Sequence, residues 1–529
     1  MSLNRAFKVK MPESRCVITK PNKHGVRYVR YLTSSERMSS SYVRINRKTI
    51  GIYDESSGML IPNNNYYDLF GESSLSAFIP KTIRNYGNYY LLYSLSSTSG
   101  LLDTIKETFP TNWDKILTIA MYLINENDAM YYIDDYCDEN YVINDTYVTS
   151  QETSTIFSRI TKDKQTNFFK SWLKMRKDNE CIAYDITSIS SYAKEIEMVD
   201  LGYNRDKENL PQINIGMFYG MNSGLPLLYD VYNGSIDDKI HFESMLKYAK
   251  SYKLDNVSLV MDRGFFKKDN LKYLYTNNIP FIMGVSLTIK EVREQLEKYK
   301  DEVKSFKYTL SDDLTNGMDT NINIDNNPYK LHLYFNQYKK ADESLIIKDK
   351  IVKLENELKS QKIITEKAKY ERFFKLNLKD SELISFERDI NKIDDLLNLT
   401  GFYTILSSRF DNDCDEILSL YRKKDLVEKT FDNLKNYIDC YRLRVHYDET
   451  MNGKLFIVFI SLILKSMIDN KIKNTTVKKV INELKKIKIQ ILANGEEYIA
   501  PLNKKQKEIL KQFNIDENEL KTSIGRLPL

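Results

Sequence analysis

The pattern of hydrophobic and polar positions changes character several times along the chain. In residues 1–75, β-branched and aromatic residues alternate with Arg and Lys over short stretches, which predicts a small antiparallel sheet with one basic face. Residues 76–178 change to the spacing of amphipathic helices and end in two helical segments joined by a polar turn. This part of the chain is therefore expected to form a β-rich region followed by a helical region.

A different rhythm starts near residue 180. Short apolar runs bounded by Gly or Pro predict strands, and the segments between the later runs have helical spacing. The expected order is three strands in a meander, then helix, strand, helix and strand, at residues 181–185, 212–220, 225–234, 237–252, 257–261, 268–276 and 280–286. This order predicts an α/β domain with a mixed sheet that helices cover.

The sheet pattern is interrupted by a charged, Lys-rich and Asn-rich stretch with an exposed helix expected at 345–362. An apolar strand pattern returns at 401–408 and leads into a long helix expected at about 414–437. The sequence therefore predicts one sheet domain interrupted by an insertion and followed by a Lys-rich C-terminal region, with boundaries at 179–286 and 401–474 for the domain, 287–400 for the insertion and 475–529 for the C-terminal region.

Composition excludes several classes of protein. The longest apolar run, residues 455–468, holds a Ser and a Lys and falls short of the roughly 20 residues that span a bilayer, so it predicts a buried helix. The net charge of +5, from 78 basic and 73 acidic residues, is too small to indicate a nucleic-acid partner by itself. Five cysteines without a CxxC pair favour a reducing cytoplasm, and residues 1–20 have no apolar core typical of a secretory signal.

Basic side chains cluster locally despite the small net charge. One cluster lies on the last two helical segments before residue 178 and includes Lys170, Lys174 and Arg176. Another lies on the N-terminal strands and consists of Arg27, Arg30, Arg44, Arg47 and Lys48. Each cluster is either a solvated charged face or a surface that binds phosphates.

Three acids stand where they could act together. Asp185 and Asp262 each end a short apolar run, a position where an Asp is often a turn former or helix cap. Glu428 lies on the long helix, and helical spacing places Tyr421, Lys424 and Lys435 on the same face as Glu428. This face is either a surface ion-pair stripe or part of a functional site.

The same residues resemble a known signature. Tyr421, Lys424, Glu428 and Lys435 resemble the YREK signature of one superfamily of bacterial insertion-sequence transposases with a DDE active site, with Lys424 where the signature has Arg. The block that starts at "YDITSIS" and continues with "LGYNRDKENLPQINIGMFYG" resembles the first acid motif of that family, and "VMDRGF" resembles the second. The resemblance covers about 180–290 and 400–470.

The resemblance implies an RNase H-like catalytic fold with an insertion before its last helix. It implies that Asp185, Asp262 and Glu428 are catalytic and bind two Mg²⁺ ions, which Mn²⁺ can replace. Carboxylates and water suit such hard cations, and three clustered acids need the positive charge. It further implies that Tyr421, Lys424 and Lys435 hold the DNA backbone near the cut, with Asn204 and Arg205 of the first motif as further DNA contacts. Arg263, next to Asp262, is expected either to contact a phosphate or to be a structural partner.

The expected function is that of a transposase that binds the ends of its insertion sequence and catalyses phosphodiester cleavage and strand transfer. Its partners would be double-stranded DNA, as terminal inverted repeats and as target, and a second copy in a synaptic complex. It would be a cytoplasmic, nucleoid-associated bacterial protein with no membrane partner. The alternatives are a DNA-binding protein that has lost catalysis and a non-transposing nuclease of the same fold. Residues 1–178 are expected to supply the sequence-specific DNA contacts.

Overall fold

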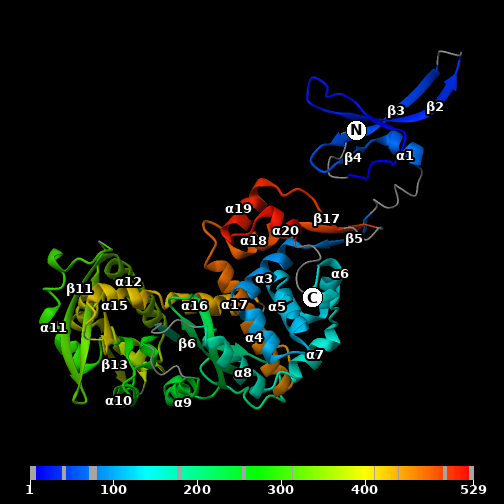
Figure 1. The fold of residues 1–529 in the computed structure, drawn as a ribbon. Helices are drawn as coiled ribbons and strands as arrows, with labels where there is room; N and C mark the ends of the chain where they lie inside the picture. The colour runs from blue at the N-terminus through cyan, green and yellow to red at the C-terminus, as the bar shows by residue number, and fades with distance from the viewer. Residues whose placement is uncertain are drawn as a thin grey trace. The chain divides into compact units, whose positions relative to one another are not determined.

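The computed structural model, traced from blue to red in Figure 1, describes residues 8–38, 43–70, 80–175, 181–252, 258–312, 314–379, 381–409, 411–438, 440–492 and 497–522. The chain forms two compact units. One comprises Met1–Ile156 and Met467–Leu529, and the other comprises Phe157–Ser466. The domain boundaries expected from the sequence stay predictions.

The unit 157–466 is built on a mixed sheet of eight strands. In spatial order they are β11 (Thr315–Ile324), β12 (Asn327–Asn336), β15 (Phe402–Ser407), β10 (Phe281–Val285), β9 (Leu259–Met261), β6 (Ile182–Ser190), β7 (Gln212–Gly220) and β8 (Leu225–Asn233). The strands β6, β7 and β8 pair antiparallel as a meander, whereas β9 and β10 run parallel to β6 on its other side. This order and these directions are those of an RNase H-like sheet, so the expected fold class is confirmed.

Helices cover both faces of this sheet. Their bounds are α8 (Lys162–Leu173), α9 (Asp238–Ser251), α10 (Lys268–Thr276), α11 (Lys290–Tyr299) and α17 (Asp448–Asp469). On one face, His241 of α9 stacks on Tyr232 of β8. On the other face, Phe169 of α8 and Phe459 of α17 pack against Tyr229 of β8. Because successive strand residues alternate between faces, α9 and the α8–α17 pair lie on opposite sides.

The stretch 287–400 contributes to the sheet as well as forming a body of its own. Its strands β11 and β12 extend the sheet by pairing with β15. The rest forms α12 (Gln337–Ser360), α13 (Lys367–Glu371), β13 (Phe374–Lys379), β14 (Glu382–Arg388) and α14 (Ile390–Asn398). These elements share a small core that includes Leu354, Leu358 and Phe374. The expected exposed helix is therefore α12, which starts earlier than its apolar pattern suggested.

The expectation of one long helix at 414–437 is wrong. The structure has α15 (Cys414–Arg422), α16 (Asp425–Asp432) and a π-helical turn η5 (Asn433–Tyr437). Between α15 and α16 the backbone hydrogen bonds span three residues instead of four. The Lys424 N–H donates to the Tyr421 carbonyl, and the Val427 N–H donates to the Lys424 carbonyl. Single π-turns inside helices are frequent at functional sites.

The apolar run at 455–468 lies in α17, and the prediction of a buried helix is confirmed. Leu455 to Leu464 are buried, including the side chains of Phe456 and Phe459. Within the described ranges, α17 is the helix long and apolar enough to cross a membrane. Its most apolar stretch of 18 residues is 94% buried inside the structure. Burial inside a fold gives a core helix the same apolar character.

The other unit contains the expected N-terminal sheet and a helical body. The sheet consists of β1 (Cys16–Ile18), β2 (Tyr28–Arg37), β3 (Val43–Asp54) and β4 (Met59–Pro62), followed by α1 (Asn64–Phe70). The helices are α3 (Gly87–Thr98), α4 (Leu101–Thr108), α5 (Trp113–Asn125), α6 (Ile133–Glu139), most of α7 (Ser150–Ser158), α18 (Val477–Leu484), α19 (Lys504–Gln512) and α20 (Glu517–Thr522). A three-stranded sheet joins β5 (Pro80–Asn85) to β16 (Lys488–Leu492) and β17 (Glu497–Ile499), so the C-terminal region folds against the segment after the N-terminal sheet (Figure 1).

Candidate active site

Asp185 and Asp262 come from adjacent parallel strands. Tyr184 of β6 is opposite Met261, the last residue of β9, so each aspartate follows a paired position. The expectation that Asp185 ends its strand is wrong, because β6 continues to Ser190 while pairing with β7. Asp185 is instead the first residue of β6 beyond the end of β9. Asp262 caps the 3₁₀ turn η3 (Arg263–Phe265), with its carboxylate accepting the Arg263 N–H at 2.8 Å.

The environment of Asp185 disfavours its charge. Burial raises the pKa of its carboxyl to about 6, and the neighbouring charge of Asp262 acts in the same direction. The Ile186 N–H, at 2.9 Å, and the charges of Lys424 and Arg205 oppose this rise without cancelling it. The two aspartates are therefore close enough to repel each other, and positive charge at this point favours their ionised forms.

Lys424 supplies positive charge among all three acids. Its side chain is only 5% exposed, and its Nζ donates to Glu428 Oε1 at 2.6 Å. Burial alone would lower the pKa of Lys424, but the hydrogen bond to Glu428 and the charges of Asp262 and Asp185 raise it above its ordinary value. A solvated ion-pair stripe on the surface does not explain a buried lysine between acids from two strands and a helix.

Tyr421 connects α15 to the end of β9. Its hydroxyl donates to Asp262 Oδ1 at 3.1 Å, and burial together with the Asp262 charge raises the pKa of the phenol. Room for this hydroxyl comes from Gly284 in β10, where a Cβ would lie 2.5 Å from the Tyr421 oxygen. Gly284 was not among the site residues expected from the sequence, although a glycine inside a buried strand is a signal of close approach by another group.

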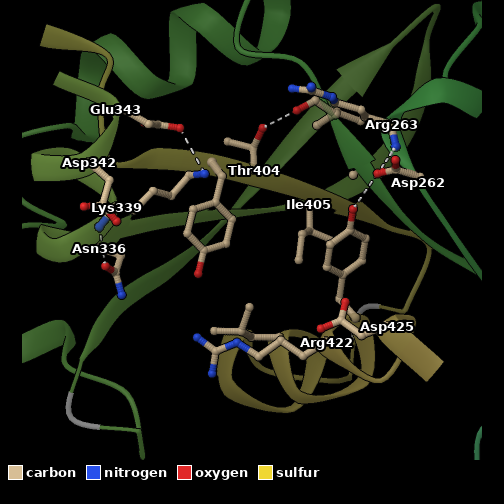
Figure 2. Close-up of a pocket in the computed structure, with 15 residues that line it drawn as sticks. Asp262, Arg263, Asn336, Lys339, Asp342, Glu343, Thr404, Ile405, Arg422 and Asp425 are labelled. Atoms are coloured by element: carbon tan, nitrogen blue, oxygen red, sulfur yellow. Dashed lines mark hydrogen bonds and ion pairs between the residues drawn. The ribbon is translucent and has the colours of Figure 1, made fainter. Parts of the chain in front are cut away.

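A pocket of about 770 Å³ opens beside Asp262 (Figure 2). Asp262 and Arg263 lie at one end, Lys339 of α12 lies at the other, and Arg422 lines a third side. Two basic groups of this pocket are paired within the protein, Lys339 with Glu343 and Arg422 with Asp312. Neither Lys339 nor Arg422 was expected at the site. Lys339 belongs to the insertion, which only the tertiary structure brings beside β9, and Arg422 follows Tyr421 on α15.

Three of the expected DNA contacts are engaged inside the fold. Lys435 Nζ lies 2.8 and 2.7 Å from the two carboxylate oxygens of Asp206, and its side chain is 10% exposed. Arg205 pairs with Asp238, and the buried Asn204 donates to Ser190 Oγ at 3.0 Å. Their expected role in DNA binding stays a prediction, and each first has a structural role in the fold.

Other expected contacts face solvent. Arg263, at the mouth of the pocket, and Lys170 and Lys174 of the basic cluster are exposed. Arg176 lies outside the described residues. The aromatic side chains of α8 are buried in the sheet unit, and Trp172 Nε1 donates to the Pro226 carbonyl at 3.0 Å.

The acids suit a hard divalent cation in chemistry but are not arranged as a finished site. In the part of the chain that the structure describes, no three His, Cys, Asp or Glu side chains are grouped closely enough to hold a metal ion. Asp185 and Asp262 provide adjacent carboxylates, whereas Glu428, 58% exposed, is bonded to Lys424. Because the pKa of Asp185 is raised, the pair of aspartates would gain from a cation, which fits oxygen-binding Mg²⁺.

The sheet defines the class of proteins with an RNase H-like fold, and comparison with known families makes the class more specific. A family model described as "Transposase DDE domain" matches residues 176–464, more than half of the chain. The protein belongs to this family of DDE transposases.

Two further comparisons give less. A comparison with curated proteins finds no match. Among solved structures, one similar chain is that of the "Cryo-EM structure of piggyBac transposase synaptic complex with hairpin DNA (SNHP)", with 10% sequence identity and a TM-score of 0.34. The match covers 82% of this chain and 75% of the other.

Proposed function

We propose that this transposase cleaves phosphodiester bonds at the ends of its own insertion sequence and joins the 3′ hydroxyl groups to target DNA, with Asp185, Asp262 and Glu428 as the catalytic acids. The observation that carries the proposal is Lys424, a buried ammonium group bonded to Glu428 and raised in pKa by the charges of Asp185 and Asp262. Acids from β6, the end of β9 and α16 share this one counter-charge. Structural ion pairs on a surface do not require such convergence.

The carboxylates of Asp185, Asp262 and Glu428 would hold two Mg²⁺ ions, which Mn²⁺ can replace. When bound, such ions activate the attacking oxygen and stabilise the charge that develops on the phosphate and the leaving oxygen. Glu428 must release Lys424 before it can serve as a ligand. Lys424 is then free to contact a phosphate next to the bond that is cut, as the family signature implies.

Tyr421 and Arg263 support the same site. The Tyr421 hydroxyl holds Asp262 by its hydrogen bond, and Arg263 lies exposed beside Asp262 where it can bind a phosphate. Lys435 becomes available to DNA only if its bond to Asp206 opens. The side chains of this site therefore change partners when DNA binds, whereas the sheet that carries them stays in place.

The proposed partners are terminal inverted repeats and target DNA, bound as duplexes, and a second copy of the chain in a synaptic complex. Residues 1–178 are proposed to make the sequence-specific contacts, because a catalytic core that acts on any target gains little from reading bases. The proposed place of action is the nucleoid in a bacterial cytoplasm.

A strand-transfer assay tests the proposal. Full-length protein is mixed with a labelled duplex copied from the DNA that flanks the gene, a target plasmid and Mg²⁺, and labelled plasmid is expected. The variant Asp262→Asn is expected to lose cleavage and transfer while gel shifts show unchanged DNA binding. Cleavage without transfer would indicate a nuclease, and binding without cleavage would indicate a protein that has lost catalysis.

A further inference from the structure

Two strands of the N-terminal sheet extend beyond their neighbours. β1 pairs with β2 only from Val29 to Tyr31, and β4 pairs with β3 only from Gly51 to Asp54. From Leu32 onward, β2 and β3 form a ladder without a third strand, up to Arg37 opposite Val43, although the Leu32 N–H also donates to the Arg15 carbonyl. We call residues 31–37 of β2 and 43–48 of β3 the ribbon; at its base, Tyr31 pairs with Cys16 of β1 as well as with Lys48.

The ribbon has two different faces, because successive residues of a strand point to opposite sides of a sheet. Residues directly opposite each other on the two strands point to the same side. Arg44, Asn46 and Lys48 share one face, and Val43, Ile45 and Arg47 share the other. All six side chains are exposed, with exposed fractions of 48% for Val43 and 47% for Ile45. No described part of the protein therefore covers either face of β3 in the ribbon.

The first face is polar and positively charged. Among the described residues, Arg44 and Lys48 make no ion pair, although Glu36 lies opposite Arg44. The amide of Asn46 donates one hydrogen bond, to Ser34 Oγ at 3.0 Å. The remaining polar atoms of the Asn46 amide can therefore bond to an outside partner. Over its two faces together, the ribbon carries Arg44, Arg47 and Lys48 but the single acid Glu36, so a polyanion is the complementary partner.

The dimensions of the ribbon fit a groove of duplex DNA. Strands lie about 4.8 Å apart, and a two-stranded ribbon with its side chains enters the major groove, which is about 12 Å wide. Six residues of β3 span roughly 20 Å at about 3.3 Å each, about the length of six base pairs. An Arg side chain can make two hydrogen bonds to the edge of a guanine, and an Asn side chain can make two to the edge of an adenine.

We propose that the ribbon reads duplex DNA by placing its Arg44–Asn46–Lys48 face in the major groove. The inference deepens the proposed transposase function, because it assigns recognition of the element ends to one structural element. The basic residues at the end of α8, Lys170 and Lys174, then hold the phosphate backbone without selecting a sequence. Val43 and Ile45 on the opposite face are not needed for reading bases.

The test uses the full-length protein and a random-sequence duplex library, from which the wild type is expected to select a motif. The variant Arg44→Lys with Asn46→Ser keeps the charge but loses the rigid guanidinium fork and the side-chain amide, each of which can make two hydrogen bonds to one base edge. The ratio of affinities for the motif and for scrambled DNA is expected to fall about tenfold or more, because a good bidentate contact discriminates by roughly 1–3 kcal/mol. The salt dependence of binding is expected to stay the same.

A matched control lies on the same ribbon. Val43→Thr with Ile45→Thr keeps charge and β-branching, and the ratio is expected to stay unchanged. An equal ratio in wild type and the Arg44–Asn46 variant overturns the proposal, as does a larger loss in the control variant. An altered oligomeric state of the control variant, with the motif intact in both variants, would assign the ribbon to a protein contact and also overturns it.

The outcomes separate this inference from the proposed function. If the wild type cleaves and joins its ends and the Arg44–Asn46 variant still selects the motif, the proposed role of the ribbon is overturned. The proposed transposase function then stands. A wild-type protein that binds no DNA overturns both. Thermal melting of each variant checks the fold, which should be unaffected because the altered side chains are exposed.

Discussion

The candidate active site and the ribbon both carry basic side chains, but in opposite surroundings. At the site, Lys424 pairs with Glu428, Lys435 with Asp206 and Arg205 with Asp238. On the ribbon, Arg44 and Lys48 have no carboxylate partner among the described residues. These three cations of the site are paired with carboxylates of the protein itself, whereas Arg44 and Lys48 of the ribbon can bind an outside anion without breaking an ion pair.

This difference suggests a division of labour. A phosphate can meet the cations of the ribbon without breaking an existing ion pair, so the ribbon suits first contact with DNA. A phosphate that contacts Lys424 must replace the carboxylate of Glu428, which becomes a ligand if cations bind to it. Binding and catalysis would then depend on different conditions, DNA binding on salt and catalysis on divalent metal.

The largest expected effect concerns the charge balance of the site in metal-free protein. The pKa of Asp185 is about 6 in the fold and 3.8 ordinarily, so between these values the folded protein keeps a proton that the unfolded chain has released. The contribution of Asp185 to the free energy of unfolding should therefore decrease as pH rises from about 4 to about 6, by up to roughly 3 kcal/mol. Urea unfolding at several pH values measures it.

The variant Asp185→Asn is the comparison for that measurement. It lacks the titrating carboxyl, so its free energy of unfolding should decrease less over the same pH range. Adding Mg²⁺ should also reduce the loss in the wild type, because a cation favours the ionised carboxylate. Identical pH profiles for wild type and variant would show that Asp185 is not held in a desolvated, charge-poor place.

A second prediction tests the support of Asp262. In Gly284→Ala the added Cβ would lie 2.5 Å from the Tyr421 oxygen, so the hydroxyl must leave Asp262. Cleavage is expected to fall about 10- to 100-fold, since a misplacement of about 1 Å can cost that much. DNA affinity should stay unchanged. Gly264→Ala is the matched control, because its Cβ meets nothing within 4 Å; equal effects of both variants would contradict the assigned contact.

A third prediction concerns Lys424. Lys424→Ala removes the shared counter-charge and should lower the rate of cleavage about tenfold. Lys424→Arg should hold or raise it, because a guanidinium group can bond a phosphate with two donors. Cleavage of a labelled duplex end measures both variants. Unchanged cleavage by Lys424→Ala would show that Lys424 and Glu428 form only a structural ion pair.

The smallest expected effect sharpens the contrast between reading and holding DNA. Lys170 and Lys174 are exposed near the end of α8. Changing both to Ser should reduce the slope of log affinity against log salt concentration by about 1.8, because each phosphate that is no longer neutralised removes roughly 0.9 from the slope. The preference for the selected motif should stay. Lys348→Ser with Lys353→Ser on the exposed side of α12 is the control, and an equal change there would indicate unspecific electrostatics.

The sequence alone determined much of the local structure and the family. Residues 268–276 were expected to be helical and form α10, and the apolar run at 455–468 lies in the buried helix α17. Such segments are predictable because hydrophobic periodicity records which side of an element is buried. The motifs around Asp185, Asp262 and Glu428 indicated a DDE transposase with an RNase H-like sheet, and the family and the fold are confirmed.

Only the tertiary structure decided which side chains meet. Periodicity placed Lys424 and Glu428 on one helix face, but it could not show that Lys424 is buried beside Asp185 and Asp262, or that the helix breaks between α15 and α16. The bond between Lys435 and Asp206 joins residues far apart in the chain. The same is true of the pairing of β16 with β5. Contacts of this kind depend on strand register and on the packing of distant elements, which local patterns do not record.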